Sequence, residues 1–263
     1  MAERLDVALA ARGLARSRTH AATLIAGGLV TVDGSPVVRA SAKVGDDQQI
    51  VVAGADHYVS RGAHKLLAAL DAFHVEVAGR VALDAGASTG GFSQVLLERG
   101  ARWVVAVDVG HGQLARELEG EPRLISHEGI NVRELTHDSF ARLPGGDERP
   151  ELVVADLSFI SLTQVLPALR DVAAATADFV LLVKPQFEVG RTGVREGIVH
   201  DPGLRADAIG GVLWSAWDLG LGTSGVIASP IAGSHGNREF LVQLTERGSN
   251  PTEWLEQVRS LAG

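Results

Sequence analysis

Four short apolar runs in the sequence each end at a single ionisable residue. The residues that end the runs are Asp84, Asp108, Asp156 and Lys184. Carboxylates accept hydrogen bonds from hydroxyl and ammonium groups, and a lysine amine can hold or take up a proton. If the runs are strands of one parallel sheet, their carboxyl ends lie at the same edge, where such sheets bind ligands. We therefore expect the four residues to converge on one crevice.

Lysine is rare in this chain, which has 21 arginines but only three lysines, Lys43, Lys65 and Lys184. The side chain of arginine stays protonated in proteins, whereas burial readily shifts the pKa of lysine. Lys184 directly follows the apolar run 179–183, which is not a surface context. The use of lysine at this position favours a chemical role over a generic positive charge.

A glycine-rich turn follows the first apolar run. Its candidate cofactor-binding residues are Gly86, Ser88, Thr89, Gly90, Gly91 and Phe92, together with Asp84 before the turn and Asp108 after the next run. Glycines allow the backbone to approach a bound molecule closely. The nicotinamide fingerprint G-x-G-x-x-G is broken because Ser88 occupies the second glycine position. With Asp108 placed to accept both hydroxyls of a ribose, the pattern favours S-adenosylmethionine over a dinucleotide.

The apolar runs alternate with segments that have helical character. We expect helices at 62–73, 92–99, 113–118 and 162–175, and this alternation indicates a doubly wound α/β domain with a mostly parallel sheet. A last strand begins near Phe240, and if it is antiparallel, Glu239 joins Asp156 and Lys184 at the same edge. Lys65, on the helix before the first strand, can reach over the same rim.

The first 54 residues predict a small α+β module. Helices at 4–12 and 18–26, the second capped by Ser17, precede a ribbon made of 29–32, the hairpin turn Asp33-Gly34, 37–38 and 50–52. Residues 1–43 carry a net charge of +3, although the whole chain has −8. The basic residues, which are candidate phosphate contacts, are Arg4, Arg12, Arg16, Arg18, Arg39 and Lys43.

Composition narrows the class of protein. A chain of 263 residues with 46% hydrophobic residues can bury a full core, and its length predicts one large domain or one domain plus a small module. The absence of cysteine excludes disulfides, zinc–thiolate sites and a cysteine nucleophile, and no H-E-x-x-H spacing supports a metal. A charged amino terminus and no long apolar run predict a cytoplasmic protein without a membrane span.

Two stretches resemble known families. The first, with Gly13-Leu14-Ala15-Arg16-Ser17-Arg18 and Gly28-Leu29-Val30-Thr31-Val32-Asp33-Gly34, resembles the S4 RNA-binding domain. The second contains Ser60-Arg61-Gly62-Ala63-His64-Lys65, and its order Lys65, Asp156, Lys184, Glu239 resembles the catalytic tetrad of FtsJ-like ribose 2′-O-methyltransferases. The whole chain is similar to the TlyA (hemolysin A-type) methyltransferases.

This resemblance implies a Rossmann-like S-adenosylmethionine-dependent methyltransferase fold with an antiparallel last strand, preceded by an S4 domain. The implied division is an S4 domain at 1–54, a linker at 55–60 and a methyltransferase domain at 61–263. The implied reaction is methylation of a cytidine 2′-hydroxyl in ribosomal RNA of the large and in some members also the small subunit. Ribosomal RNA is the expected partner, with no obligate protein partner and no membrane.

Alternatives remain. A base amino-methyltransferase would carry [DN]-P-P-[FYW] where this chain has Asp156-Leu157-Ser158-Phe159, and a cysteine-dependent pyrimidine C5-methyltransferase is excluded by the composition. A membrane-lytic hemolysin conflicts with the buried-sheet pattern. An S4-type ribosome-binding factor with a degenerate methyltransferase body stays open, and S-adenosylmethionine binding would separate it from the enzyme.

Overall fold

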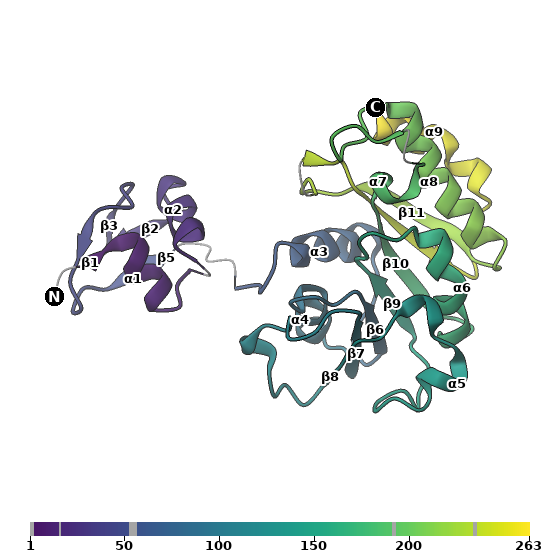
Figure 1. The fold of residues 1–263 in the computed structure, drawn as a ribbon, viewed down its shortest axis with the longest axis horizontal. Helices are drawn as coiled ribbons and strands as arrows, with labels where there is room; N and C mark the ends of the chain where they lie inside the picture. The colour runs from purple at the N-terminus through teal and green to yellow at the C-terminus, as the bar shows by residue number, and fades with distance from the viewer. Residues whose placement is uncertain (1–2, 16, 53–56, 191–192, 234–235) are drawn as a thin grey trace. The chain divides into compact units, whose positions relative to one another are not determined.

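The chain forms two compact units, Met1–His57 and Tyr58–Gly263 (Figure 1). The computed structural model describes residues 3–15, 17–52, 57–190, 193–233 and 236–263. The boundaries that the sequence predicts for the two domains and the linker stay predictions, and linker residues 55 and 56 lie outside the described residues. Each unit is described below by itself.

The first unit is a small α+β module with its own core. Its elements are β1 (Glu3–Arg4), α1 (Leu5–Ala11), α2 (Arg18–Ala26), β2 (Val30–Val32), β3 (Ser35–Pro36), β4 (Lys43–Val44) and β5 (Ile50–Val52). The side chain of Ser17 accepts a hydrogen bond from the backbone of His20, so the predicted cap of α2 is confirmed. Leu5, Leu9 and Ile25 are fully buried between the two helices and the ribbon.

The second unit contains one seven-stranded sheet. Its strands are β6 (Val81–Ala85), β7 (Trp103–Asp108), β8 (Leu124–Glu128), β9 (Leu152–Ala155), β10 (Asp178–Val183), β11 (Gly222–Ala228) and β12 (Phe240–Thr245). Its helices are α3 (Gly62–Phe73), α4 (Gly91–Glu98), α5 (His137–Phe140), α6 (Leu162–Val172), α7 (Pro185–Glu188), α8 (Pro202–Trp217) and α9 (Leu255–Ala262), with 3-10 turns at Arg116–Leu118, Val132–Glu134 and Pro251–Trp254.

The strand order is β11-β12-β10-β9-β6-β7-β8. Strands β6 to β10 run parallel, whereas β12 runs antiparallel to both of its neighbours, β10 and β11. Phe240, the first residue of β12, therefore pairs with Val183, the last residue of β10. The prediction that an antiparallel last strand begins at the carboxyl edge of the sheet is confirmed.

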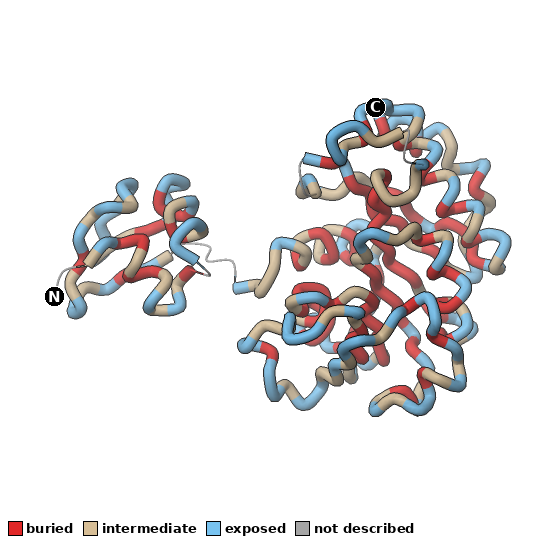
Figure 2. Tube along the Cα trace, viewed as in Figure 1, coloured by how far each residue is buried: buried red, intermediate tan, exposed pale blue. Residues whose placement is uncertain are grey.

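Both faces of the sheet are covered, which explains why the central strands are apolar at every position. On one face Ala82 and Val154 pack with Leu66 of α3 and Val95 of α4. On the other face Leu83 and Val153 pack with residues of α6, α8 and α9. Figure 2 shows these central strands as the buried centre of the unit.

The prediction of a helix at 113–118 is wrong, because only the 3-10 turn Arg116–Leu118 forms there. The backbone of Ala115 instead donates a hydrogen bond to the carbonyl of Thr89, and Leu114 and Leu118 pack over Gly90. This segment thus covers the glycine turn rather than continuing as a regular helix. In the first unit, the returning strand is β3, because the turn at Asp33-Gly34 pairs Val32 directly with Ser35.

Candidate active site

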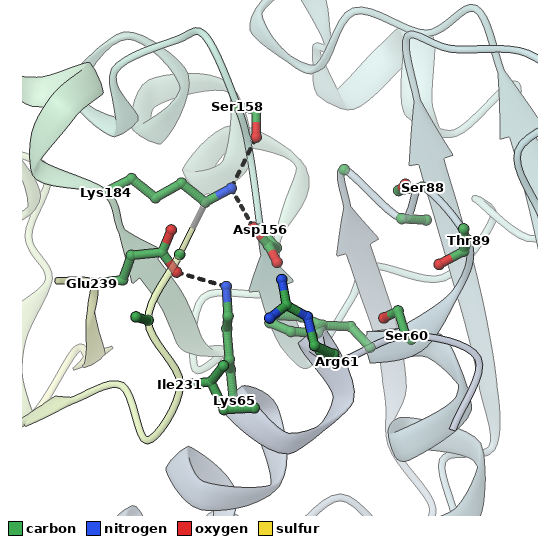
Figure 3. A pocket seen from close by; sticks show the side chains of 17 residues that line it. Ser60, Arg61, Lys65, Ser88, Thr89, Asp156, Ser158, Lys184, Ile231 and Glu239 are labelled. Atoms are coloured by element: carbon green, nitrogen blue, oxygen red, sulfur yellow. Dashed lines mark hydrogen bonds and ion pairs between the residues drawn. The ribbon is translucent and has the colours of Figure 1, made fainter. Parts of the chain in front are cut away.

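Two lysine–carboxylate pairs lie at the carboxyl edge of the sheet (Figure 3). Lys184 Nζ lies 2.6 Å from Asp156 Oδ1, and it also donates a hydrogen bond of 2.9 Å to Ser158 Oγ. Lys65 Nζ lies 2.6 Å from Glu239 Oε2. The structure therefore brings together all four residues whose types and positions suggested a tetrad.

The four residues come from four different elements. Lys65 lies on the first turns of α3, Asp156 follows β9, Lys184 follows β10, and Glu239 precedes β12. The antiparallel direction of β12 is what places Glu239 at this edge, since a parallel strand would begin at the opposite one. Glu239 also packs against Gly233 so closely that a Cβ at this glycine would overlap its carboxylate.

The two pairs line a cavity of about 390 Å³. Its other walls are the glycine turn after β6, the start of α3 at Ser60, Arg61 and Gly62, and the loop Ile231–Gly233. Both lysines and Glu239 are at least nine-tenths buried. Among the described residues, Arg61 is the cation of this wall with no carboxylate in ion-pair contact, and Figure 3 shows its guanidinium turned toward the cavity.

The glycine turn forms the floor of this cavity. Gly86 has a φ of +84°, and a Cβ there would lie 2.9 Å from the carbonyl oxygen of Asp156, so glycine is required. The cavity is also lined by Ser88, Thr89, Gly91 and Phe92, which the sequence predicts as cofactor-binding residues. Gly90 lies behind the turn, where Leu114 and Leu118 cover it.

A second cavity of about 470 Å³ shares four lining residues with the first, so the two are adjacent. The shared residues are Gly86, Ser88, Asp156 and Ser158. Asp108 lies in its wall and accepts hydrogen bonds from the backbone of Ser88 at 2.8 Å and of Gly110 at 2.7 Å. Each carboxylate oxygen keeps a further lone pair, so Asp108 can also accept from a ligand hydroxyl.

Asp84 is not part of either cavity wall, unlike the neighbouring residues of the turn. Its carboxyl group is fully buried and accepts a hydrogen bond of 2.6 Å from Ser93 Oγ on α4. The pKa of Asp84 is raised to about 7, mainly by burial; the hydrogen bond from Ser93 lowers this pKa and the nearby charge of Asp156 raises it. Asp84 therefore supports the turn from below, and a direct contact with a cofactor does not follow from its position.

Several residues of the site have no strong signal in the sequence. Ser158 and Phe159 are in the loop after β9, and Asn131 follows β8, an edge strand that is half exposed and was not predicted. Phe159 is 92% exposed and has a φ of +65°, which is rare for an aromatic residue and costs free energy. An exposed aromatic ring held in a strained conformation beside a cavity points to a binding role.

The basic residues of the first unit differ in their contacts. Arg4 and Arg18 both bind the carboxylate of Asp6, and the hydrogen bond from Arg4 holds the pKa of Asp6 at about 2 against the effect of burial. Arg12 donates hydrogen bonds to the carbonyls of Gln48 and Gly45, so its side chain stabilises the fold of the first unit. Arg39 and Lys43 are exposed, and Arg16 lies outside the described residues.

The fold and the site together define a Rossmann-like methyltransferase domain that is preceded by a small RNA-binding module. Residues 58–246 match the FtsJ-like methyltransferase family, and residues 3–50 match the S4 domain. The chain belongs to the FtsJ-like methyltransferase family and carries an S4 domain.

Two curated relatives and one solved structure cover most of the chain. A TlyA protein of Mycobacterium tuberculosis, named 16S/23S rRNA (cytidine-2′-O)-methyltransferase, is 52% identical over 92% of this chain and 89% of its own length. Hemolysin A of Brachyspira hyodysenteriae is 37% identical over 90% of this chain and 98% of its own. The structure of a proposed hemolysin from Streptococcus thermophilus is 36% identical, covers 99% and 95% of the two chains, and has a TM-score of 0.75.

The name hemolysin raises the question of membrane contact. Across the described ranges of the chain, no helix is both long enough and apolar enough to span a bilayer.

Proposed function

We propose that this protein transfers a methyl group from S-adenosylmethionine to the 2′-hydroxyl of a cytidine in ribosomal RNA. The observation that carries the proposal is the pair of lysine–carboxylate contacts in the first cavity, where Asp156 also lines the second. The similarity to a relative named for this reaction supports the choice of nucleotide and RNA. Modification of ribosomal RNA would take place in the cytoplasm.

The residues of the two cavities fit S-adenosylmethionine. Asp108 and Asn131 in the second cavity would hold the adenosine part, and the turn at Gly86–Phe92 would hold the amino-acid part along the floor of the first. When bound, this cofactor supplies an electrophilic methyl group on a sulfonium. The carboxylate of Asp156 lies in the walls of both cavities, where it would stabilise that positive charge.

Methyl transfer forms a bond between the 2′-oxygen and the methyl carbon, breaks the methyl–sulfur bond and releases one proton. A ribose hydroxyl is a poor nucleophile at neutral pH, so the site must orient the hydroxyl or take its proton. We assign this task to Lys184, whose amine is held between Asp156 and Ser158. Lys65 and Glu239 line the same cavity and would support the position of the ribose.

The RNA would be held at two places. In the second unit, Arg61 offers a guanidinium to a phosphate and the exposed ring of Phe159 offers a surface on which a base can stack. In the first unit, Arg4, Arg18, Arg39 and Lys43 are exposed and would contact the RNA backbone. We assign Arg12 to the stability of the module because its guanidinium donates to two carbonyls of the same module.

The test is transfer of labelled methyl from S-adenosylmethionine to purified ribosomal subunits, followed by alkaline hydrolysis. A 2′-O-methyl group blocks cleavage at its nucleotide, so the label should appear in an alkali-resistant dinucleotide. Label in an alkali-sensitive mononucleotide would contradict the ribose assignment and indicate methylation of a base. Binding of S-adenosylmethionine without any transfer would favour a ribosome-binding factor with a degenerate body.

Replacement of Asp108 with alanine is expected to weaken S-adenosylmethionine binding by about tenfold or more, because hydrogen bonds to a charged group are worth roughly 1.5–3 kcal/mol. The substitution also frees the backbone N–H groups of Ser88 and Gly110, which loosens the turn. Isothermal titration calorimetry measures the affinity. Glu256→Ala, on the exposed surface of α9, is the control, and an unchanged affinity in Asp108→Ala would remove Asp108 from the site.

Deletion of the first unit, leaving residues 58–263, is expected to preserve S-adenosylmethionine binding and to lower the affinity for ribosomal RNA. The exposed arginines of the first unit contact phosphates in this proposal, so binding by the whole chain should also weaken steeply with salt. Filter binding at several salt concentrations measures both effects. Equal RNA affinity of the fragment and the whole chain would require another role for the first unit.

A further inference from the structure

The loops that follow β9 and β10 lie side by side and contact each other along their length. The first loop contains Asp156, Ser158 and Phe159. The second, which includes the short helix α7, contains Lys184 and Phe187. Lys184 binds Asp156 and Ser158, and the rings of Phe159 and Phe187 have centroids 5.2 Å apart. These contacts belong to the site or border it.

Glu188 makes the contact between the two loops that is farthest along the chain from the site. It is the last residue of α7, and its side chain reaches the amino terminus of α6, the helix that follows the neighbouring strand β9. Its Oε1 accepts a hydrogen bond of 2.8 Å from the backbone of Leu162, and its Oε2 accepts one of 2.5 Å from Ser161 Oγ. Neither Glu188 nor its two partners line either cavity.

The position of Glu188 gives these bonds particular strength. A carboxylate that accepts a backbone N–H at the start of a helix makes charge-assisted hydrogen bonds and faces the positive end of the helix dipole. Burial raises the pKa of Glu188, while the bonds from Leu162 and Ser161 lower it. Ser161 is itself the cap of α6, because its Oγ accepts from the backbone of Thr163. Glu188 therefore fixes the point at which the loop after β9 enters α6.

We propose that Glu188 is a positioning residue for methyl transfer, which fixes the loop carrying Asp156 and Ser158 against the segment carrying Lys184. This inference rests on the proposed function, because it assigns Lys184 a role in the reaction. Three residues separate Lys184 from Glu188, and five separate Asp156 from Leu162, so the two loops are tied at both ends. Without the hydrogen bonds of Glu188, the distances from Lys184 to Asp156 and Ser158 depend only on the contacts near the site.

The experiment compares Glu188→Ala with Glu188→Gln in the full chain. Alanine removes both acceptors, whereas glutamine keeps one amide oxygen for Leu162 and can remain bonded to Ser161, whose hydroxyl can reverse. We expect Glu188→Ala to lower kcat by about tenfold or more, which corresponds to about 1.4 kcal/mol per factor of ten. We expect Glu188→Gln to restore most of kcat. The Kd for S-adenosylmethionine and the KM for ribosomal subunits should change by less than about threefold, because their assigned contacts are retained.

Two further variants separate positioning from a general loss of stability. Asp171→Ala is a control, because Asp171 also accepts a backbone N–H at the start of another helix, from His137 of α5, away from the site. Asp171 is exposed and Glu188 is half-buried, so Asp171→Ala should lower the melting temperature less than Glu188→Ala does and leave kcat unchanged. Ser161→Ala should lower kcat in part, and its effect should not add to that of Glu188→Ala because both break the same contact.

Each outcome bears on one of the two proposals. An unchanged kcat in Glu188→Ala would overturn the positioning role, and so would a fall in kcat that Asp171→Ala reproduces. A Glu188→Gln variant as impaired as Glu188→Ala would also overturn it, because the role would then not rest on hydrogen-bond geometry. Absence of methyl transfer in the unsubstituted protein would instead contradict the proposed function.

Discussion

Replacement of Lys184 with arginine is expected to abolish methyl transfer almost as completely as replacement with alanine. Arginine keeps a positive charge at the end of β10, but a guanidinium does not lose its proton in proteins and is bulkier than an ammonium. If Lys184 takes or closely orients the ribose proton, either substitution should lower kcat by about 10²–10⁴-fold. Labelled methyl transfer to ribosomal subunits measures the effect.

Both Lys184 variants should still bind S-adenosylmethionine and RNA, because the glycine turn and the first unit are unchanged. Calorimetry and filter binding provide this control. Near-normal transfer by Lys184→Arg would mean that the site needs only positive charge at this position. The group that accepts the proton would then have to be sought among the other residues of the cavity.

Single substitutions at Lys65 or Glu239 are expected to destabilise the protein, whereas a joint substitution should restore stability but not activity. The side chains are 11% and 2% exposed, so the pair is buried. Removing one partner of a buried ion pair costs about 3–5 kcal/mol, because the other charge is left without compensation, whereas joint replacement by apolar residues is often neutral. Glu239→Ala should therefore destabilise the second unit strongly, and Lys65→Met/Glu239→Leu should recover most of the loss.

Activity should not recover with stability. If Lys65 and Glu239 hold the ribose, the double variant will unfold at nearly the urea concentration of the unsubstituted protein and yet transfer methyl groups far more slowly. Arg99→Ala is the control for stability, because its contact with Asp71 is exposed and such surface pairs contribute about 0–1 kcal/mol. A stable and fully active double variant would show that the pair serves folding alone.

The sequence predicts the central strands well because they are buried on both faces and therefore apolar at every position. It does not predict β8, since this edge strand is half exposed and reads as an ordinary polar segment. The segment 113–118 has helical composition, but Leu114 and Leu118 are used to cover Gly90. Tertiary packing decides both cases, and a single sequence carries little information about it.

The candidate site shows a similar division. Strand ends place Asp156 and Lys184 at one edge, and this much follows from the alternation of strands and helices. Which lysine meets which carboxylate does not follow, because it depends on how α3 and β12 approach the edge. The sequence treats Asp84 and Asp108 alike, yet Asp108 lies in a cavity wall and Asp84 is enclosed beneath the turn.

The insertion of β12 between β10 and β11 has a consequence for the order in which the protein matures during synthesis. β11 is made earlier than β12 but can join the sheet only through it, and the contact between Lys65 and Glu239 spans 174 residues of chain. Contacts of such long range form late, because the intervening chain must be ordered first. The strands and turn that would hold the cofactor are synthesised well before Glu239 leaves the ribosome. Under the proposed function, a nascent chain would therefore complete the residues of its cofactor site before it completes the tetrad.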